Sequence, residues 1–529
     1  MSTAIGHSLY EKGEARRSFV HCDHSTQAGL GTRTHRMSLF SPLELLRALS
    51  VRIHERWVVL ALLILTLVIA FNKLDSSDIS DYDEARQIVN AVEMNRNANW
   101  LNLYYNGEPD TWNAKPPLFV WSMVISMKVF GTSLWSARLP AALSGTVTVL
   151  LFYLLIRIHR GQLFALFTCL LLLSSKAVFG SHLARTADFD AMFVMFLTGG
   201  TVMLELGLRR SMKYGILMTG LFFGLAFLTK GTAIFLVIPG IVAYLFFTGQ
   251  LRGLVHRPQT YFATLLFLTI SLGWLILSAQ SGETFVSEKS LYGASSSWHT
   301  LIYHDTIGRY FGLTGFEAGK GHRPLFFFVA LDLLLNVWWY LILIGLAVGI
   351  SRISKQGTAF LRELFSRERL ISISVFVTMP LVVLLSMSAT QFVWYYGPIT
   401  PYLAILITYS VRWLVINHKA SGFLVSAMMV ALLGRELLRT ETYSEDKAKC
   451  FRHLQDDLHT SPIKFVDLSL GPAWLALVKL HSPQALGIDI DGRFQESGIT
   501  LKAHPLDTEH PCGVAIATAL LQTPRVAGS

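Results

Sequence analysis

Eleven long apolar runs restrict this chain more than any other feature of its sequence. Most of them are long enough for an α-helix to cross the hydrocarbon core of a bilayer. Apolar residues make up 52% of the 529 residues, and charged residues only 15%. We therefore predict an all-α polytopic membrane protein with about 11 to 13 transmembrane helices. The runs lie at 57–72, 138–158, 162–180, 190–208, 214–229, 232–249, 260–278, 325–350, 371–388, 395–415 and 421–438.

The cations between the runs predict how the chain crosses the membrane. If the N-terminus is cytoplasmic, the loops on the inside are rich in Lys and Arg and the outside connections hold few. Cytoplasmic loops of membrane proteins carry such an excess of positive charge. The net charge of +10 then reflects topology and contact with the lipid bilayer, and nothing indicates nucleic-acid binding. The inside cations are Arg157, Arg160, Arg209, Arg210, Lys213, Arg252, Arg257, Arg352, Lys355, Arg362, Arg367, Arg369, Arg412 and Lys419.

Both ends of the chain differ from its apolar middle, which predicts three domains. Residues 1–56 form a basic, polar cytoplasmic segment in which no cleavable signal peptide is visible. Within it, residues 38–57 fit either an amphipathic helix on the inner leaflet or an extension of the first span. Residues 57–440 form the transmembrane domain. An odd number of spans places residues 441–529 outside, where the composition predicts a small α/β domain.

Two cysteines, Cys450 and Cys512, lie in this outer tail. Disulfides persist in oxidising compartments, so we predict a bridge between them. The Cα atoms of a bridged pair must come within about 7 Å of each other, which a sequence does not show. Two unpaired cysteines are therefore the alternative.

A polar insert, residues 72–137, separates the first two apolar runs and concentrates charge at the outer face. Asp83 and Glu84 begin an expected helix, with Arg86 one turn after Asp83 on the same face. Lys115 precedes two prolines, so we expect extended backbone there, followed by a helix that the second proline opens. Charge beside a bilayer is costly and is typical of functional sites. The alternative is a solvated loop with an ordinary helix cap.

Further polar groups fall on the same predicted outer side. Each has a plain alternative: a local ion pair, a snorkelling lysine or an interfacial aromatic belt. Their joint placement on one side favours a common site. They are Arg185, Asp188 and Asp190 before the fourth run, Lys230 within a long apolar stretch, the loop 280–324, and the pair Tyr395 and Tyr396.

Cations and carboxylates at the outer face suit a transfer reaction whose leaving group is a lipid phosphate. Arg binds phosphate through two parallel hydrogen bonds, and Lys binds it as a point charge. Such cations stabilise the charge that develops on a departing phosphate. A carboxylate beside them can act as general base toward an acceptor hydroxyl, or can stabilise positive charge at the reacting carbon.

Four motifs follow one another along the chain. They are Tyr82-Asp83-Glu84-Ala85-Arg86, Trp112-Asn113-Ala114-Lys115-Pro116-Pro117-Leu118, Ala184-Arg185-Thr186 with Asp188 and Asp190, and Phe227-Leu228-Thr229-Lys230-Gly231. Together, and in this order, they resemble the GT-C glycosyltransferases. The closer resemblance is to the bacterial branch that holds the protein O-mannosyltransferases and the lipid A aminoarabinose transferase, and it covers about residues 55–440.

The resemblance implies a GT-C-like fold and a sugar donor carried on a polyprenyl phosphate. It further implies inversion at the anomeric carbon and transfer at the periplasmic face of a bacterial inner membrane to a lipid, polysaccharide or protein acceptor. By the family pattern Asp83 is the essential carboxylate, Arg86, Lys115 and Lys230 meet the donor phosphate, and Tyr395 matches an aromatic residue near the site. The clusters above add Glu84, Asp188 and Asp190 as catalytic candidates, Arg185 for phosphate, and Tyr82, Tyr396 and His299 for substrate.

Two departures from the family pattern affect the predictions for a bound metal and for the acceptor. Ala114 stands where an acidic residue often precedes Lys-Pro-Pro, which removes a potential metal ligand. We expect no cofactor, and a divalent metal is the alternative that the sequence does not support. The segment Gln391-Phe392-Val393 replaces a Lys-Leu-Pro element, which weakens lipid A as the acceptor. Histidines of the 280–324 loop do not have the spacing of a zinc motif. We expect ordinary loop residues at His299, His304 and His322, one of which could contact substrate.

Two other classes of protein share some of these features. A transporter or flippase places charge near the bilayer midplane on broken helices and often contains inverted repeats, whereas the charges here cluster at one face and no repeat is visible. A catalytically inactive relative would act as an assembly subunit. The presence of Asp83, Lys115 and Lys230 argues against that alternative.

Overall fold

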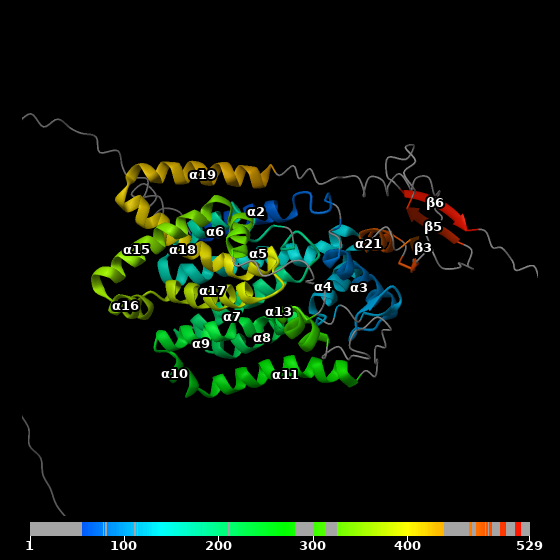
Figure 1. Ribbon diagram of the computed structural model, residues 1–529, viewed down its shortest axis with the longest axis horizontal. Coiled ribbons are helices and arrows are strands. Elements are labelled where there is room, and N and C mark those ends of the chain that lie inside the picture. Colours follow the sequence, from blue (N-terminus) through cyan, green and yellow to red (C-terminus); the bar gives the residue numbers. More distant parts are fainter. Residues whose placement is uncertain are drawn as a thin grey trace, which may run out of the picture. The chain divides into compact units, whose positions relative to one another are not determined.

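The computed structural model describes most of the transmembrane domain and parts of the C-terminal unit (Figure 1). Cys450, Cys512, His299 and His322 lie outside the described residues, so the disulfide and the expectations for these histidines stay predictions. The structure describes residues 55–77, 79, 82–110, 113, 115–180, 182–209, 212–280, 300–313, 325–438, 465–467, 472–481, 483–484, 486–488, 498–503 and 514–519.

Helices occupy all eleven predicted apolar runs. Among the described residues, eight helical segments are long and apolar enough to cross a membrane. The predicted all-α polytopic fold is therefore confirmed. The helices are α2 (Glu55–Phe71), α5 (Leu134–Arg160), α6 (Gln162–Leu173), α7 (Asp190–Leu208), α8 (Gly215–Lys230), α9 (Ile238–Phe247), α11 (Pro258–Gln280), α14 (Phe326–Leu335), α15 (Tyr340–Gln356), α17 (Arg369–Met387), α18 (Thr400–Asn417) and α19 (Lys419–Leu437).

Close helix crossings hold the bundle together. Helix α7 packs against α5 and α8, α8 packs against α11, and α17 packs against α9 and α18. In Figure 1, α7, α8 and α11 run side by side. At the crossing of α8 and α11 a Cβ atom on Gly220 would lie 2.1 Å from the Ala263 carbonyl oxygen. Small residues allow such approach between membrane helices, where packing rather than burial from water drives association.

Three short 3₁₀ helices extend or interrupt the membrane spans. They are η1 (Gly231–Leu236) after α8, η3 (Asn336–Trp339) between α14 and α15, and η4 (Val393–Ile399) before α18. Gly231 has a φ of +60°, and a Cβ atom there would lie 2.8 Å from Leu301 Cδ1, so the turn requires glycine. Non-helical backbone at membrane depth is tolerated where it is buried in protein or lines a cavity. Both η1 and η4 line the cavity described below.

The first loop folds into a helical cap at one end of the bundle. Helix α3 (Asp83–Asn97) begins where the sequence predicts, and a hairpin of β1 (Tyr104–Tyr105) and β2 (Glu108–Pro109) follows it. Helix α4 (Leu118–Phe130) begins directly after Pro117, as expected. Figure 1 shows α3 and α4 at the end of the bundle opposite α10 (Leu251–Val255) and α16 (Ala359–Arg367).

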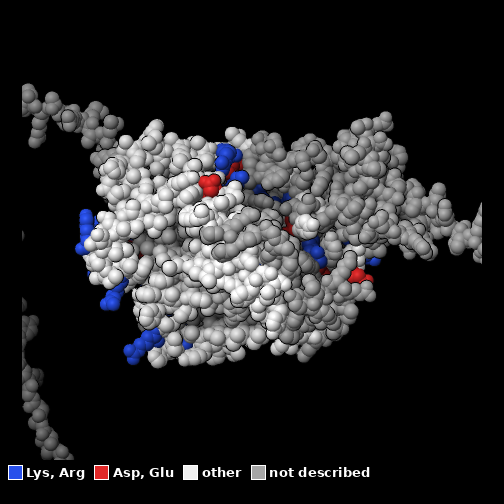
Figure 2. Space-filling model, in the orientation of Figure 1, with Lys and Arg blue, Asp and Glu red and all other residues white. Residues whose placement is uncertain are grey.

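The opposite end gathers cations that the sequence assigns to the inside. Arg157 contacts Glu55 at 2.7 Å, Arg369 approaches Glu205 at 3.6 Å, and Figure 2 shows basic side chains at the end where α10 and α16 lie. A largely uncharged surface covers the helices between the two ends in this view. This distribution suits a bilayer around the middle of the bundle.

The C-terminal unit contains a small mixed sheet and one helix. Strands β3 (Phe465–Asp467), β4 (Leu486–Ile488), β5 (Gly498–Ala503) and β6 (Val514–Ala519) pair in the order β4-β3-β5-β6. Strand β3 is parallel to β4 and β5, and β5 is antiparallel to β6. Helix α21 (Pro472–His481) packs against α3. The predicted α/β character of this region is confirmed.

Candidate active site

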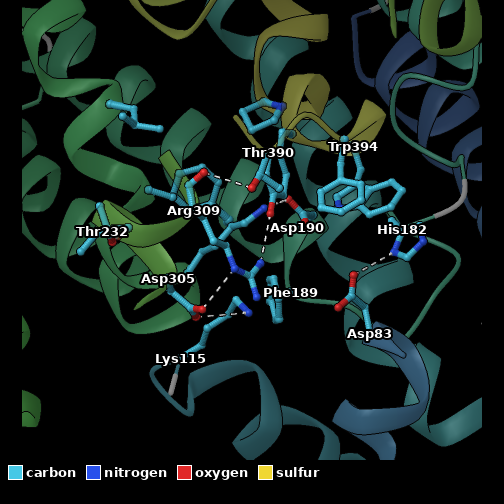
Figure 3. A pocket seen from close by; sticks show the side chains of 18 of the residues that line it. Asp83, Lys115, His182, Phe189, Asp190, Thr232, Asp305, Arg309, Thr390 and Trp394 are labelled. Carbon is cyan, nitrogen blue, oxygen red and sulfur yellow. Dashed lines mark hydrogen bonds and ion pairs between the residues drawn. The ribbon is translucent and has the colours of Figure 1, made fainter. Parts of the chain in front are cut away.

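A cavity of about 700 Å³ lies where the first loop meets the bundle. Its walls come from α3, the segment before α7, the junction of α8 with η1, the π-helical segment η2 (Thr300–Gly308) with α13 (Arg309–Phe311), α17 and η4. Figure 3 shows its polar side chains converging from these elements. The predicted site residues that line it are Tyr82, Asp83, Arg86, Lys115, Asp188, Asp190, Lys230 and Tyr395.

Asp83 opens helix α3 at the edge of the cavity. The preceding Tyr82 has φ 66° and ψ −80°, and it is 72% exposed. Such backbone angles are rare and strained for a residue with a side chain, and they occur at functional sites. This sharp turn places the half-buried carboxylate of Asp83 and the aromatic ring of Tyr82 on the cavity wall.

His182 connects Asp83 to Asp188. Its Nδ1 lies 3.2 Å from Asp188 Oδ2 and 3.9 Å from Asp83 Oδ2, and its ring stacks on Trp394 with centroids 3.9 Å apart. The other Asp188 oxygen accepts the Phe189 N–H at 2.8 Å. The stack and the hydrogen bond hold the imidazole facing Asp83, as Figure 3 shows.

The environments of Asp83 and His182 shift the pKa of both groups. Burial, and then the negative charge of Asp188, raise the pKa of Asp83 above its usual 3.8. Burial acts to lower the pKa of His182, but the hydrogen bond and charge of Asp188 and the charge of Asp83 outweigh it, so that pKa lies above 6.5. A carboxylate with a raised pKa is a stronger base, and positive charge on the nearby His182 acts in the opposite direction, lowering the pKa of Asp83.

Lys230 lies at the inner wall of the cavity. Its ammonium group donates a hydrogen bond to the buried Asp190 carboxylate, and it lies 5.5 Å from the Phe189 ring centroid and 5.3 Å from that of Tyr395. Lys230 ends α8 and Asp190 begins α7, so the pair joins two membrane helices. A charged lysine in this position can meet an anion that enters the cavity.

A second cationic group stands across the cavity from Asp83. Lys115 Nζ lies 3.9 Å from Asp305 Oδ2, and Arg309 Nε lies 3.3 Å from Asp305 Oδ1. Arg309 also donates to the Tyr395 hydroxyl at 3.3 Å. Two cations thus share the single carboxylate of Asp305 (Figure 3). Both cations border the cavity, where they can meet an anionic group.

Arg309 and His182 are residues that sequence reasoning missed. His182 lies in the same short segment as Arg185 and Asp188, which was a usable signal. Arg309 lies in the 280–324 loop, where only the histidines were considered as candidates. Its role depends on a contact with Tyr395 across 86 positions in the chain, and no local pattern indicates such a contact.

Three membrane segments and the loop segment η2 supply an apolar wall to the same cavity. Phe193 comes from α7, Leu236 from η1, Leu301 from η2, and Leu381 and Leu385 from α17. The cavity therefore joins a polar end to an apolar flank. An amphiphile with a charged head and a hydrocarbon tail suits both surfaces.

Among the described residues, three predicted site residues do not line the cavity. Glu84 is fully buried and accepts two hydrogen bonds from Arg138 at 2.7 and 2.9 Å. Arg185 donates to four carbonyl groups at the end of α2, including that of Ile69 at 2.9 Å, so it caps this helix. Tyr396 is fully buried and packs on Phe327. These three residues hold elements of the fold together, through contacts with segments that lie far away in the sequence.

Arg86 faces the cavity but has a strong partner. Its Nε donates to Asp110 Oδ2 at 2.8 Å, and its guanidinium lies 4.5 Å from the Tyr105 ring centroid. Asn90 also donates to Asp110, at 2.9 Å. Arg86 therefore braces α3 against the segment that leads to Lys115, and its positive charge still borders the cavity.

Asp83, His182 and Asp188 are the one group among the described residues that could together hold a metal ion. Their ligand atoms lie within 4.8 Å of one another. However, His182 Nδ1, the nitrogen nearest both carboxylates, is already hydrogen-bonded to Asp188. A metal would have to replace this bond. The arrangement does not fit a preformed metal site.

Comparisons with known proteins identify the fold. The family model described as dolichyl-phosphate-mannose-protein mannosyltransferase matches residues 114–276. The structure of ArnT from Cupriavidus metallidurans bound to undecaprenyl phosphate superposes with a TM-score of 0.61 at 18% identity, covering 85% of this chain and 93% of that chain. The chain has the GT-C glycosyltransferase fold. The resemblance seen in the four motifs is thus confirmed at the level of the superfamily.

Relatives by sequence include two enzymes named undecaprenyl phosphate-alpha-4-amino-4-deoxy-L-arabinose arabinosyl transferase. The one from Pseudomonas aeruginosa (strain UCBPP-PA14) is 26% identical over 52% of this GT-C chain and 48% of its own length. That from Pseudomonas fluorescens (strain Pf0-1) is 23% identical over 78% of this chain and 70% of its own length. For the first relatives found, the chain covers between 38% and 48% of their length.

Proposed function

We propose that this protein is an integral membrane glycosyltransferase that moves a sugar from a polyprenyl-phosphate donor to a lipid, polysaccharide or protein acceptor. One observation carries the proposal. The Asp83 carboxylate, the cations Lys115, Lys230 and Arg309, and an apolar wall from three membrane segments border the same cavity. A lipid-linked sugar phosphate needs these three surfaces together.

The proposed reaction assigns a role to each side of the cavity. Asp83 accepts the proton of an acceptor hydroxyl while the oxygen attacks the anomeric carbon on the face opposite the phosphate. The bond between this carbon and the phosphate oxygen breaks, the anomeric configuration inverts, and polyprenyl phosphate departs with the electron pair. Lys115, Lys230 and Arg309 stabilise the negative charge that develops on the phosphate.

The cations at the end of the bundle opposite the cavity support an orientation. Positive charge gathers on the cytoplasmic side of membrane proteins, and Arg157 and Arg369 lie at the far end from Asp83 and Lys115. We place the cavity at the periplasmic face of a bacterial inner membrane, with the N-terminus in the cytoplasm and residues 441–529 outside.

The decisive experiment combines a transfer assay on purified protein with glycan analysis of a deletion strain. Purified protein in detergent is given synthetic polyprenyl-phosphate sugars and an envelope extract, and release of polyprenyl phosphate is measured with sugar incorporation. We expect both to appear in equal amounts. Mass spectrometry of envelope glycans from a deletion strain then identifies the sugar and acceptor. Movement of intact lipid-linked sugar across proteoliposomes without release of phosphate would instead establish a flippase.

Lys115→Ala and Arg309→Ala should each weaken donor binding by at least about tenfold, because a hydrogen bond to a charged group contributes about 1.5–3 kcal/mol. Titration of a fluorescent polyprenyl-phosphate analogue measures the affinity. Lys128→Ala, at the exposed end of α4, is the matched control and should bind like wild type. Unchanged affinity in both cavity variants would mean that the phosphate binds elsewhere.

The acid limb of the pH profile should report the ionisation of Asp83. Its carboxylate must be charged to accept a proton, so turnover falls as the pH drops through a pKa that burial and Asp188 raise above 3.8. The positive charge of His182 lowers this pKa. His182→Gln removes that charge and should move the acid limb to higher pH. An unmoved limb would show that another group controls it.

Chelation should leave activity within about twofold, since His182 Nδ1 is already hydrogen-bonded to Asp188 and the group does not fit a preformed metal site. Transfer is measured after dialysis against EDTA and again after adding Mg²⁺, Mn²⁺ or Zn²⁺. Full inhibition that one added ion reverses would assign Asp83, His182 and Asp188 as metal ligands.

A further inference from the structure

Lys479 of the C-terminal unit is a buried cation away from the proposed active site. Its side chain is 0% exposed and its Nζ lies 2.6 Å from Glu93 Oε1, on a carboxylate whose side chain is 4% exposed. Its neighbours on α21, including Leu475, Val478 and Leu480, are buried apolar residues. A lysine within this apolar face of α21 thus reaches the first-loop helix α3.

Glu93 also holds the hairpin that follows α3. The Gly107 N–H, in the turn between β1 and β2, donates to both Glu93 oxygens at 2.9 and 3.1 Å. One carboxylate therefore joins α21, α3 and the hairpin. A buried ion pair often contributes little net stability, since apolar residues of similar volume can stabilise a protein as well or better. The effect of this pair that matters here is on the relative positions of α21, α3 and the hairpin.

Two paths lead from Glu93 to the cavity, one along the backbone of α3 and one through hydrogen bonds of the hairpin. Along α3, Asp83 stands ten residues before Glu93, a distance of about 15 Å at 1.5 Å per residue in a rigid helix. Along the hairpin, Asp110 receives hydrogen bonds from Arg86, Asn90 and the Asn113 N–H just before Lys115. A shift at Glu93 would therefore reach both the carboxylate and one of the cations of the cavity.

We propose that Lys479 is a positioning residue, through which the C-terminal unit fixes α3 and the hairpin so that Asp83 and Lys115 face each other across the cavity. The inference rests on the proposed function for its kinetic consequence. Its mechanical part, the coupling of α21 to residues 83–110, stands independently of any activity.

The test uses the full-length protein in nanodiscs and compares Lys479→Met with the double variant Glu93→Gln/Lys479→Met. Gln at position 93 keeps an acceptor for Gly107 and leaves no buried charge unpaired, so the double variant should regain thermal stability. Its kcat should still be at least about tenfold below wild type, because small misplacement of catalytic groups costs up to about a hundredfold. The KM for donor should change much less.

Hydrogen exchange gives a readout independent of catalysis. Both variants should raise deuterium uptake in residues 83–110 and leave α7 and α8 unchanged. The matched control is Glu363→Gln/Arg367→Met, an exposed ion pair on α16, which should alter neither kcat nor uptake. Wild-type kcat in the stable double variant, or unchanged uptake in residues 83–110, would overturn the proposal. Wild-type protein that consumes no donor would overturn the proposed function, while the exchange result would still decide the coupling.

Discussion

Asp83→Asn should lower the turnover number for sugar transfer by at least about a hundredfold, the effect typical of losing a general base. Asparagine keeps the size of the side chain and removes the charge that would accept the acceptor's proton. The raised pKa of Asp83, caused by burial and by Asp188, suits this role. Donor affinity should stay near wild type, because the cations of the cavity are unchanged. Single-turnover transfer with saturating donor measures the effect.

The matched control for this substitution is Asp75→Asn. Asp75 is exposed in the segment after α2 and does not line the cavity, so this variant should transfer sugar like wild type. If a well-folded Asp83→Asn protein kept full turnover, the base would have to be another carboxylate of the cavity. Asp188 would be the next choice, since it is hydrogen-bonded to His182 in the same group.

The membrane part of the fold follows from local composition, which is why all eleven apolar runs became helices. Local composition does not predict where a run is interrupted. Residues 325–350 read as one span, yet the chain breaks at Asn336, which has a φ of 52°. The following turn buries Trp338, whose indole N–H donates to the Ser174 hydroxyl at 2.9 Å. That contact spans 164 positions in the chain, and no pattern within the run indicates it.

The candidate site was predictable where motif and topology agreed. Asp83, Lys115 and Lys230 lie in separate segments, and the expectation that they meet at one face is met by the cavity. The sequence could not distinguish cations that face the cavity from those that hold helices together. Arg185 has the same charge as Lys230, but its guanidinium caps α2. Only the position of the α2 carbonyl groups decides between the two roles.

The positions of the charged groups bear on the choice between a transferase and a flippase. A transporter needs charges near the midplane that become accessible from both sides in turn. Here Lys230 lies at the end of α8 and pairs with Asp190 at the start of α7, and both border a cavity that the first loop caps. Polar groups at the opposite end, such as Glu205, are occupied by His159 and Arg369. This arrangement favours chemistry at one face over passage.

The largest loss of stability should come from breaking the buried pair of Glu84 and Arg138. Both side chains are 0% exposed, and the guanidinium also donates to the Leu74 and Ser77 carbonyl groups at 2.9 and 3.0 Å. Glu84 accepts the Ala187 N–H at 2.8 Å. The pair thus joins α3, α5, the end of the first span and the segment that carries Asp188. Removing one partner leaves a buried charge without compensation.

Arg138→Met should therefore lower the free energy of unfolding by about 3–5 kcal/mol, seen as a lower midpoint in thermal or SDS-induced unfolding of the purified protein. The double variant Glu84→Gln/Arg138→Met should lose less, because glutamine still accepts the Ala187 N–H and no charge is stranded. Arg367→Met, in an exposed pair on α16, should change stability by less than about 1 kcal/mol. A double variant as unstable as Arg138→Met would show that the carbonyl contacts of Arg138, rather than its pairing with Glu84, hold the first loop on the bundle.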